Sequence, residues 1–168
     1  MKKGEIYTLL GRTLSGKTTL LKTIAGLIQP DSGRVLFEGK DLSSIPVWKR
    51  NIAMVYQQFI NYPSLTVYEN IASPLRIAGY DPAEIDNRVQ QAAALLKLTS
   101  YLESLPSNLS GGQQQRTAIA RAIVSRPSIL IADEPTANLD KEYAEEIMNI
   151  FYSFQQVGVT VIISTHEI

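Results

Sequence analysis

The segment from Gly11 to Thr18 has the residue types and spacing of a phosphate-binding loop. It reads Gly-Arg-Thr-Leu-Ser-Gly-Lys-Thr and satisfies the pattern G-x-x-x-x-G-K-[ST]. In such a loop, backbone N–H groups surround a phosphate chain, Lys17 reaches its β and γ phosphates, and the Thr18 hydroxyl ligates Mg²⁺. A glycine turn with a solvated lysine is the alternative. The residues that we predict to contact a nucleoside triphosphate here are Gly11, Arg12, Thr13, Leu14, Ser15, Gly16, Lys17, Thr18 and Thr19.

Two adjacent carboxylates, Asp133 and Glu134, follow the aliphatic run Ile129 to Ala132. Open α/β sheets bind ligands at the carboxyl ends of their strands, which favours a position beside the phosphate loop. Neighbouring strand residues point to opposite faces, so we predict separate roles for the two side chains. Asp133 is the candidate for the magnesium shell, and Glu134 is the candidate general base for the attacking water. An ordinary solvated turn is the alternative interpretation.

A second glycine-bearing segment, Leu109 to Gln113, reads Leu-Ser-Gly-Gly-Gln. Ser-x-x-Gln is also a helix capping-box pattern, which is the structural alternative. Two glycines cost helix stability unless the backbone has to approach another molecule closely. We therefore predict a second phosphate-facing helix N-terminus, and one nucleotide rarely needs two such sites from one chain. Its predicted nucleotide contacts are Ser110, Gly111, Gly112 and Gln113.

Strand-like and helix-like segments alternate along the chain and must position these motifs. The predicted strands are 6–10, 34–37, 52–56, 128–132 and 159–164, and the predicted helices include 18–28, one capped by Asp81, one from Ser110 and 141–154. We predict one α/β domain with a P-loop NTPase core, residues 1–61 and 128–168, and a mostly parallel sheet. Residues 62–127 are predicted to form an inserted α-helical subdomain. The apolar helix faces are predicted to contain Leu20, Leu21, Ile24, Leu27 and Ile28 in the first helix and Ile85, Val89, Ala92, Ala93 and Leu96 in the inserted one.

The composition excludes several classes of protein. Among the 168 residues there is no cysteine and one histidine, which rules out disulfide frameworks, thiol catalysis and a multi-histidine metal site within one chain. Sixteen basic and sixteen acidic residues give zero formal net charge, so we expect no nucleic-acid partner. No apolar stretch approaches the roughly 18 residues of a membrane-spanning helix, and the N-terminus lacks a secretory signal. We expect a cytosolic chain.

Three motifs in this order, residues 11–18, 109–113 and 129–135, resemble the nucleotide-binding subunit of the ATP-binding cassette (ABC) transporter family. The resemblance covers nearly the whole chain. It implies an ATPase that uses ATP and Mg²⁺ and lies peripherally on the cytoplasmic side of the cell membrane. It also implies that two cassettes pack head to tail, each ATP lying between the phosphate loop of one chain and residues 109–113 of the other. Transmembrane permease subunits and, indirectly, a solute-binding protein are the other implied partners.

The same resemblance assigns three more residues. Gln57 is similar to the Q-loop glutamine, which senses Mg²⁺ and the attacking water and faces the membrane partner. The segment Ala137-Asn138-Leu139-Asp140 resembles the D-loop, in which Asp140 is a nucleotide contact, and His166 resembles the switch histidine that contacts the γ-phosphate. The predicted catalytic set is therefore Glu134, His166 and Gln57, and the predicted magnesium set is Thr18, Gln57 and Asp133.

Residues 51–70 are similar to cassettes of bacterial carbohydrate and glycerol-type importers, which predicts sugar uptake as the coupled process. Three alternatives stay open: a soluble tandem cassette acting on ribosomes, a DNA-repair or chromosome-organising ATPase, and a fragment unable to hydrolyse ATP. The 51 residues between Gln57 and Leu109 are too few for the long coiled coil of the DNA-repair class. Only ten residues precede Gly11 and two follow His166, so we expect a chain truncated at both ends relative to the family.

Overall fold

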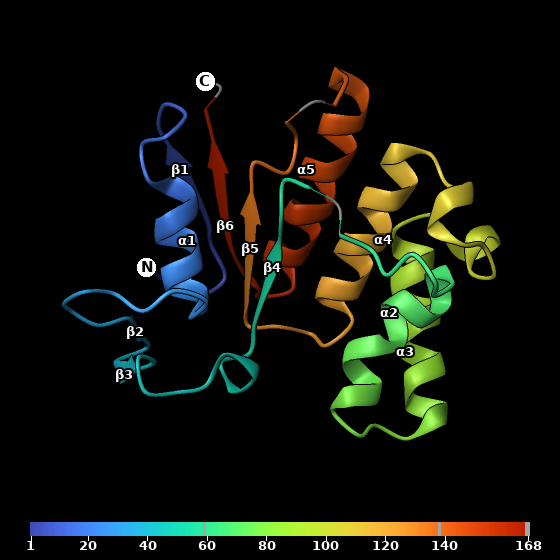
Figure 1. Cartoon of the computed structure of the whole chain (residues 1–168), viewed down its shortest axis with the longest axis horizontal. Coiled ribbons are helices and arrows are strands. Elements are labelled where there is room, and N and C mark those ends of the chain that lie inside the picture. Colours follow the sequence, from blue (N-terminus) through green and yellow to red (C-terminus); the bar gives the residue numbers. More distant parts are fainter. Residues whose placement is uncertain (59, 138, 167–168) are drawn as a thin grey trace. The chain divides into compact units, whose positions relative to one another are not determined.

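Four parallel strands form one sheet in the order β1-β6-β5-β4 (Figure 1). They are β1 (Ile6–Leu10), β4 (Ile52–Val55), β5 (Ile129–Asp133) and β6 (Thr160–Thr165). The computed structural model describes residues 1–58, 60–137 and 139–166. Its chain divides into two units, residues 1–57 with 127–168 and residues 58–126, and the sheet belongs to the first. The sequence-based boundaries, 62 and 127, differ from these by four residues and one. The predicted α/β fold with a mostly parallel sheet is confirmed.

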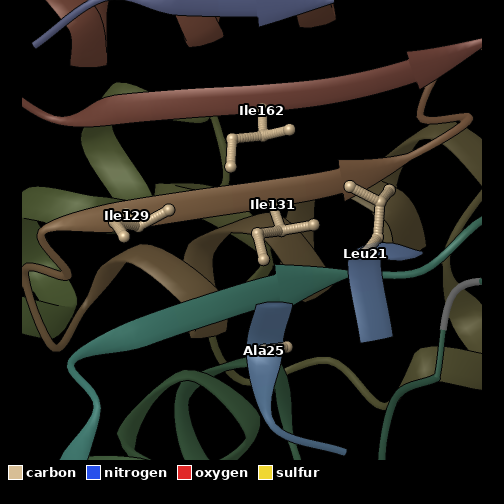
Figure 2. Packing of buried hydrophobic residues seen from close by; sticks show 5 residues of the cluster. All are labelled: Leu21, Ala25, Ile129, Ile131 and Ile162. Carbon is tan, nitrogen blue, oxygen red and sulfur yellow. The ribbon is translucent and has the colours of Figure 1, made fainter. Parts of the chain in front are cut away.

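The centre of the sheet is built from uninterrupted aliphatic residues. Every residue of β5 is buried, as expected for a parallel strand with cover on both faces. Figure 2 shows Ile129 and Ile131 of β5 and Ile162 of β6 pointing toward one helix, α1 (Lys17–Ala25), which contributes Leu21 and Ala25. This cluster fixes α1 against the sheet, and with it the loop that precedes the helix.

The second face of the sheet is covered by α5 (Lys141–Gln156), which packs against β6. Leu130, Val161 and Ile163 alternate with the residues that face α1 and are also buried, so they point the other way. The buried side chains of α5 are Ile147, Phe151 and Phe154. Helices therefore cover both faces of the sheet.

The first helix is shorter than predicted. Gly26 adopts a left-handed conformation with φ 84° and closes α1 at Ala25, through N–H bonds to the carbonyls of Lys22 and Thr23. Leu27 and Ile28, predicted on the buried face of this helix, lie beyond its end and are exposed, and Leu20 is also exposed. The predicted apolar face was therefore wrong at these three positions and correct at Leu21, which is fully buried.

Leu21 and Leu20 make a matched pair for testing this core. Leu21→Ala should lower the free energy of unfolding by about 2–5 kcal/mol, because it leaves a cavity between α1 and the sheet. Leu20→Ala should change it by less than about 1 kcal/mol, since that side chain is nearly half exposed. Urea unfolding followed by circular dichroism measures both. Equal losses would contradict the assigned burial.

A small hairpin, β2 (Leu36–Phe37) with β3 (Lys40–Asp41), follows α1. Its turn residues Glu38 and Gly39 both have positive φ, the conformation of a two-residue hairpin turn. The strand predicted over 34–37 is limited to its last two residues, and β4 ends at Val55, one residue before the predicted end. A short 3₁₀ helix, η1 (Val47–Lys49), lies between β3 and β4.

The second unit is helical, with α2 (Val67–Ile77), α3 (Pro82–Leu95) and α4 (Gly111–Ile123) packed against one another. Two 3₁₀ helices, η2 (Thr99–Tyr101) and η3 (Pro106–Asn108), connect α3 to α4. Asp81 caps α3 as predicted, accepting from the N–H groups of Ala83 and Glu84. The predicted apolar face is buried at all five positions, Ile85, Val89, Ala92, Ala93 and Leu96. Within the described ranges, no helix has both the length and the apolar character needed to cross a bilayer.

Candidate active site

The predicted catalytic residues of the first unit all follow strand ends at one edge of the sheet. The phosphate loop follows β1, Gln57 follows β4, Glu134 follows β5 and His166 follows β6. Because the four strands are parallel, their carboxyl ends meet at the same edge. The Gly11 N–H donates to the Thr165 carbonyl at 3.3 Å, which joins the start of the loop to the end of β6.

The phosphate loop leads into a helix whose N-terminus has no side-chain cap. The N-cap position of α1 is Gly16, with φ 91°, whereas Thr66, Asp81, Ser110 and Asp140 cap α2, α3, α4 and α5. The first N–H groups of α1 are therefore available to an anion, which the helix dipole also attracts. The loop residues Arg12, Thr13, Leu14, Ser15, Gly16, Thr18 and Thr19 are exposed.

Two loop positions have steric requirements of their own. A Cβ on Gly11 would lie 2.7 Å from the Ser15 hydroxyl oxygen, so only glycine fits there without rearrangement. Leu14 has a left-handed backbone with φ 66° and a fully exposed side chain. A leucine in this conformation is strained, and glycine would adopt it at lower cost.

Lys17 lies at the first position of α1, and its side chain folds back over the loop. Its ammonium Nζ donates to the carbonyls of Gly11 at 2.6 Å and Arg12 at 3.1 Å. It also lies 3.4 Å from Glu134 Oε1, and only 7% of the side chain is exposed. The loop, the lysine and the candidate general base therefore lie within direct contact of one another.

Glu134 connects this lysine to the single histidine of the chain. Its second carboxylate oxygen, Oε2, lies 3.0 Å from His166 Nδ1, and its side chain is 15% exposed against 40% for His166. Separate roles for Glu134 and Asp133 were predicted from the alternation of side chains along a strand. This argument was wrong, because only Asp133 belongs to the strand. Glu134 lies beyond β5 in a left-handed conformation, with φ 47°, so a turn rather than the strand pleat directs its side chain.

Ser164 is a polar residue at this edge that lies outside the functional motifs recognised in the sequence. It is fully buried, and its hydroxyl donates to Asp133 Oδ1 at 2.6 Å and accepts from the Glu134 N–H at 2.9 Å. The β5–β6 register pairs Asp133 with Ser164. Its place two residues before His166 was the available signal, but only the register of two strands identifies its partners.

The residues predicted to hold Mg²⁺ are chemically suited to it. Asp133 is a buried carboxylate with one oxygen bound by Ser164, and Thr18 and Gln57 present an exposed hydroxyl and an exposed amide. Mg²⁺ prefers oxygen ligands and is usually bound by one or two carboxylates together with substrate phosphates. Across the described part of the chain there is no cluster of three or more His, Cys, Asp or Glu side chains suited to a metal ion. The donor set thus fits an ion that takes further ligands from a nucleotide.

Residues 109–113 lie in the second unit and form the start of α4. Ser110 and Gln113 make a reciprocal capping box: the Ser110 hydroxyl accepts from the Gln113 N–H at 3.3 Å, and Gln113 Oε1 accepts from the Ser110 N–H at 2.9 Å. The capping box, which was the structural alternative to a phosphate-facing role for this motif, is therefore formed. Gly111 is different, because a Cβ there would meet no atom within 4 Å and its φ is not positive.

The predicted D-loop residue Asp140 also has a structural role. Its carboxylate caps α5 by accepting from the Tyr143 N–H at 3.1 Å. Asn138, in the middle of the predicted D-loop, lies outside the described residues. Nucleotide contact by Asp140 stays a prediction.

Comparisons with known proteins agree with the motifs. The family model described as "ABC transporter" matches residues 1–137. The chain is 42% identical to the spermidine/putrescine import ATP-binding protein PotA of Nitrosomonas europaea, over 99% of this chain and 46% of that protein. It is also 42% identical to the cell division ATP-binding protein FtsE of Escherichia coli K12, over 100% of this chain and 78% of that protein. The chain thus spans about half the length of PotA.

The fold also matches a solved structure over almost its full length. This is the dimeric structure of a post-hydrolysis state of the ATP-binding cassette MJ0796 bound to ADP and Pi, with a TM-score of 0.89 and 34% identity. The match covers 99% of this chain and 77% of that one.

Proposed function

Because the chain belongs to the ABC transporter family, whose cassettes are ATPases that bind ATP with Mg²⁺, we propose that it is the ATP-hydrolysing part of an ABC transporter. The observation that carries the proposal is the contact of Glu134 with both Lys17, at 3.4 Å, and His166, at 3.0 Å, beside the uncapped N-terminus of α1. A phosphate-binding helix end, a cation and a general base at one sheet edge suit phosphoryl transfer to water.

The phosphate chain of ATP is bound, in this proposal, by the backbone N–H groups of the loop and by the first N–H groups of α1. The Lys17 ammonium group contacts the β and γ phosphates and stabilises the negative charge that increases there during the reaction. Thr18, Gln57 and Asp133 would hold Mg²⁺, which would supply positive charge to offset the negative charge of the phosphates.

Hydrolysis then proceeds at the γ-phosphorus. The water oxygen bonds to phosphorus as the bond to the ADP oxygen breaks, and Glu134 accepts a proton from the water. ADP and inorganic phosphate are the products. His166 holds the Glu134 carboxylate through its Nδ1 contact, so the base keeps its orientation while the reaction proceeds.

A second cassette is proposed to complete each site with residues 109–113. The support is Gly111: neither a close neighbour nor a left-handed backbone within the described chain requires glycine there. Glycine in the first turn of a helix costs up to about 1 kcal/mol relative to alanine. No contact within this polypeptide explains why the costly glycine is present at position 111. Close approach of a nucleotide's phosphates, bound by a second cassette, would explain it. The dimeric state of MJ0796 with ADP and Pi is consistent with this arrangement.

Gly111→Ala tests the second-cassette proposal, because it should affect folding and function in opposite directions. We expect the melting temperature to be unchanged or raised, since alanine favours the helix and meets no atom. ATP-driven dimerisation should weaken at least about 10-fold, a loss of 1.4 kcal/mol or more, because a methyl group would occupy the space of the nucleotide. Light scattering with and without MgATP, together with phosphate release, measures the effect.

The matched control is Asn87→Ala, on an exposed position of α3 in the same unit. It also raises helix propensity and lies outside residues 109–113, so ATP-dependent dimerisation should match that of the unmodified chain. If Gly111→Ala dimerised and hydrolysed ATP normally, completion of the site by a second cassette would be wrong. If the unmodified chain failed to release phosphate from ATP, the proposed hydrolytic function itself would be wrong.

The process coupled to hydrolysis is proposed to be import, through permease subunits, at the cytoplasmic face of the membrane. A solute-binding protein would act indirectly. PotA bears the name of a polyamine importer and FtsE that of a cell division protein, at equal identity to this chain, so similarity selects no substrate. Carbohydrate import stays a prediction from residues 51–70. Part of that stretch has structural roles: Thr66 and Glu69 form a capping box, and buried Asn70 binds the backbone of Tyr62.

A further inference from the structure

We propose that Ser164 is a positioning residue of the hydrolytic site: its buried hydroxyl joins the Asp133 carboxylate to the backbone turn that directs Glu134. The proposal rests on the proposed ATPase function. It assigns a role to a buried side chain that acts through the Asp133 carboxylate and the Glu134 backbone N–H.

The direction of the hydrogen bonds follows from the chemistry of the three groups. The Glu134 N–H can only donate, so the Ser164 oxygen accepts from it at 2.9 Å. The single hydroxyl proton of Ser164 is then directed to Asp133 Oδ1, at 2.6 Å. The two hydrogen bonds therefore run in one direction, from the Glu134 amide to the Ser164 hydroxyl and from there to the Asp133 carboxylate. Bonds of this kind strengthen one another, and a bond to an ionised carboxylate is stronger than a neutral one.

For Asp133, the bond fixes which carboxylate oxygen is available. Oδ1 accepts from the Ser164 hydroxyl at 2.6 Å. The bond therefore restricts rotation of the carboxylate and leaves Oδ2 as the oxygen with which Asp133 would ligate Mg²⁺. Partners that orient a metal ligand in this way typically change metal affinity by about 10–100-fold when removed.

For Glu134, the same hydroxyl supports an unfavourable backbone conformation. A glutamate with φ 47° is stable only where its surroundings hold it. Its N–H has two acceptors, the Ser164 hydroxyl at 2.9 Å and the Ser164 carbonyl at 3.2 Å, both from one residue. Loss of the hydroxyl leaves the Glu134 N–H with only the longer of these two bonds, which weakens the support of the turn from which the Glu134 side chain reaches Lys17 and His166.

The experiment compares Ser164→Ala with Ser164→Thr, which keeps a hydroxyl on a strand position. For Ser164→Ala we expect an apparent Mg²⁺ affinity about 10–100-fold lower, measured as the Mg²⁺ concentration that half-stabilises the ATP-bound chain against heat. Calorimetric ATP affinity in EDTA should stay within about twofold, since this hydroxyl contacts no phosphate-loop residue, and kcat should fall about 10-fold. Ser164→Thr should restore the Mg²⁺ dependence to within about threefold. If the alanine variant does not fold, Ser164→Cys fills the same space with a weak donor and should show the same loss.

Thr160→Val is the matched control. Thr160 is a buried hydroxyl residue on the same strand, and its hydroxyl accepts from the Gly4 N–H at 2.9 Å, away from both carboxylates. It should lower the melting temperature without changing the Mg²⁺ dependence. Normal Mg²⁺ dependence in Ser164→Ala would overturn the role of Ser164 and leave the ATPase proposal intact. Failure of the unmodified chain to bind MgATP would overturn both.

Discussion

Replacement of Glu134 with glutamine is expected to slow ATP hydrolysis by about 10²–10⁴-fold while ATP binding is retained, which is the usual contribution of a general base. The amide has nearly the shape of the carboxylate and keeps an acceptor oxygen for Lys17, 3.4 Å away. It cannot take a proton from water. Single-turnover phosphate release, beside calorimetric titration with MgATP, separates the chemical step from binding.

Glu38→Gln provides the control for this substitution. Glu38 is also a glutamate with a left-handed backbone, φ 49°, but it is exposed and pairs only loosely with Lys3, at 4.0 Å. Removal of its charge should leave hydrolysis unchanged. If Glu134→Gln hydrolysed ATP at the rate of the Glu38→Gln variant, another group would have to accept the proton.

Lys17→Ala is expected to weaken MgATP binding by about 10²–10³-fold. Lys17 is nearly buried, so its contact with the phosphates forms in a site with little water, where truncating one partner of a charge pair costs about 2–5 kcal/mol. The substitution also removes the bonds from Nζ to the Gly11 and Arg12 carbonyls and leaves the loop less well held. Calorimetry measures the affinity, and circular dichroism verifies that the helix is retained.

Lys22→Ala tests whether any lysine of α1 would have this effect. Lys22 lies in the last turn of the same helix, away from the phosphate loop. Its removal should change MgATP affinity by less than about threefold, because this partly buried side chain lies in the last turn of α1, at the opposite end of the helix from the phosphate loop. Equal losses in both variants would indicate a general charge effect and would exclude a specific phosphate contact by Lys17.

The parts of the fold predicted well are those specified by neighbouring residues. In α3, a capping aspartate, a first-turn proline and an apolar face all agree, and the helix starts at Pro82 with that face buried. In α1 the apolar spacing continues through Ile28, but Gly26 takes a left-handed conformation and ends the helix. Periodicity was the wrong signal there, and the glycine was the informative residue.

The amino-acid sequence alone determined which motifs the chain carries and that they follow strand ends, because a phosphate loop or an apolar strand is encoded by residues close together in the chain. Only the tertiary structure decided how these motifs meet. Ser164 and Asp133 are 31 residues apart, and their bond depends on the parallel register of β5 and β6. The direction of Glu134 likewise depends on a strained turn held by that neighbouring strand. Such contacts depend on packing between segments that are distant in the sequence, so the spacing of residues within one segment does not predict them.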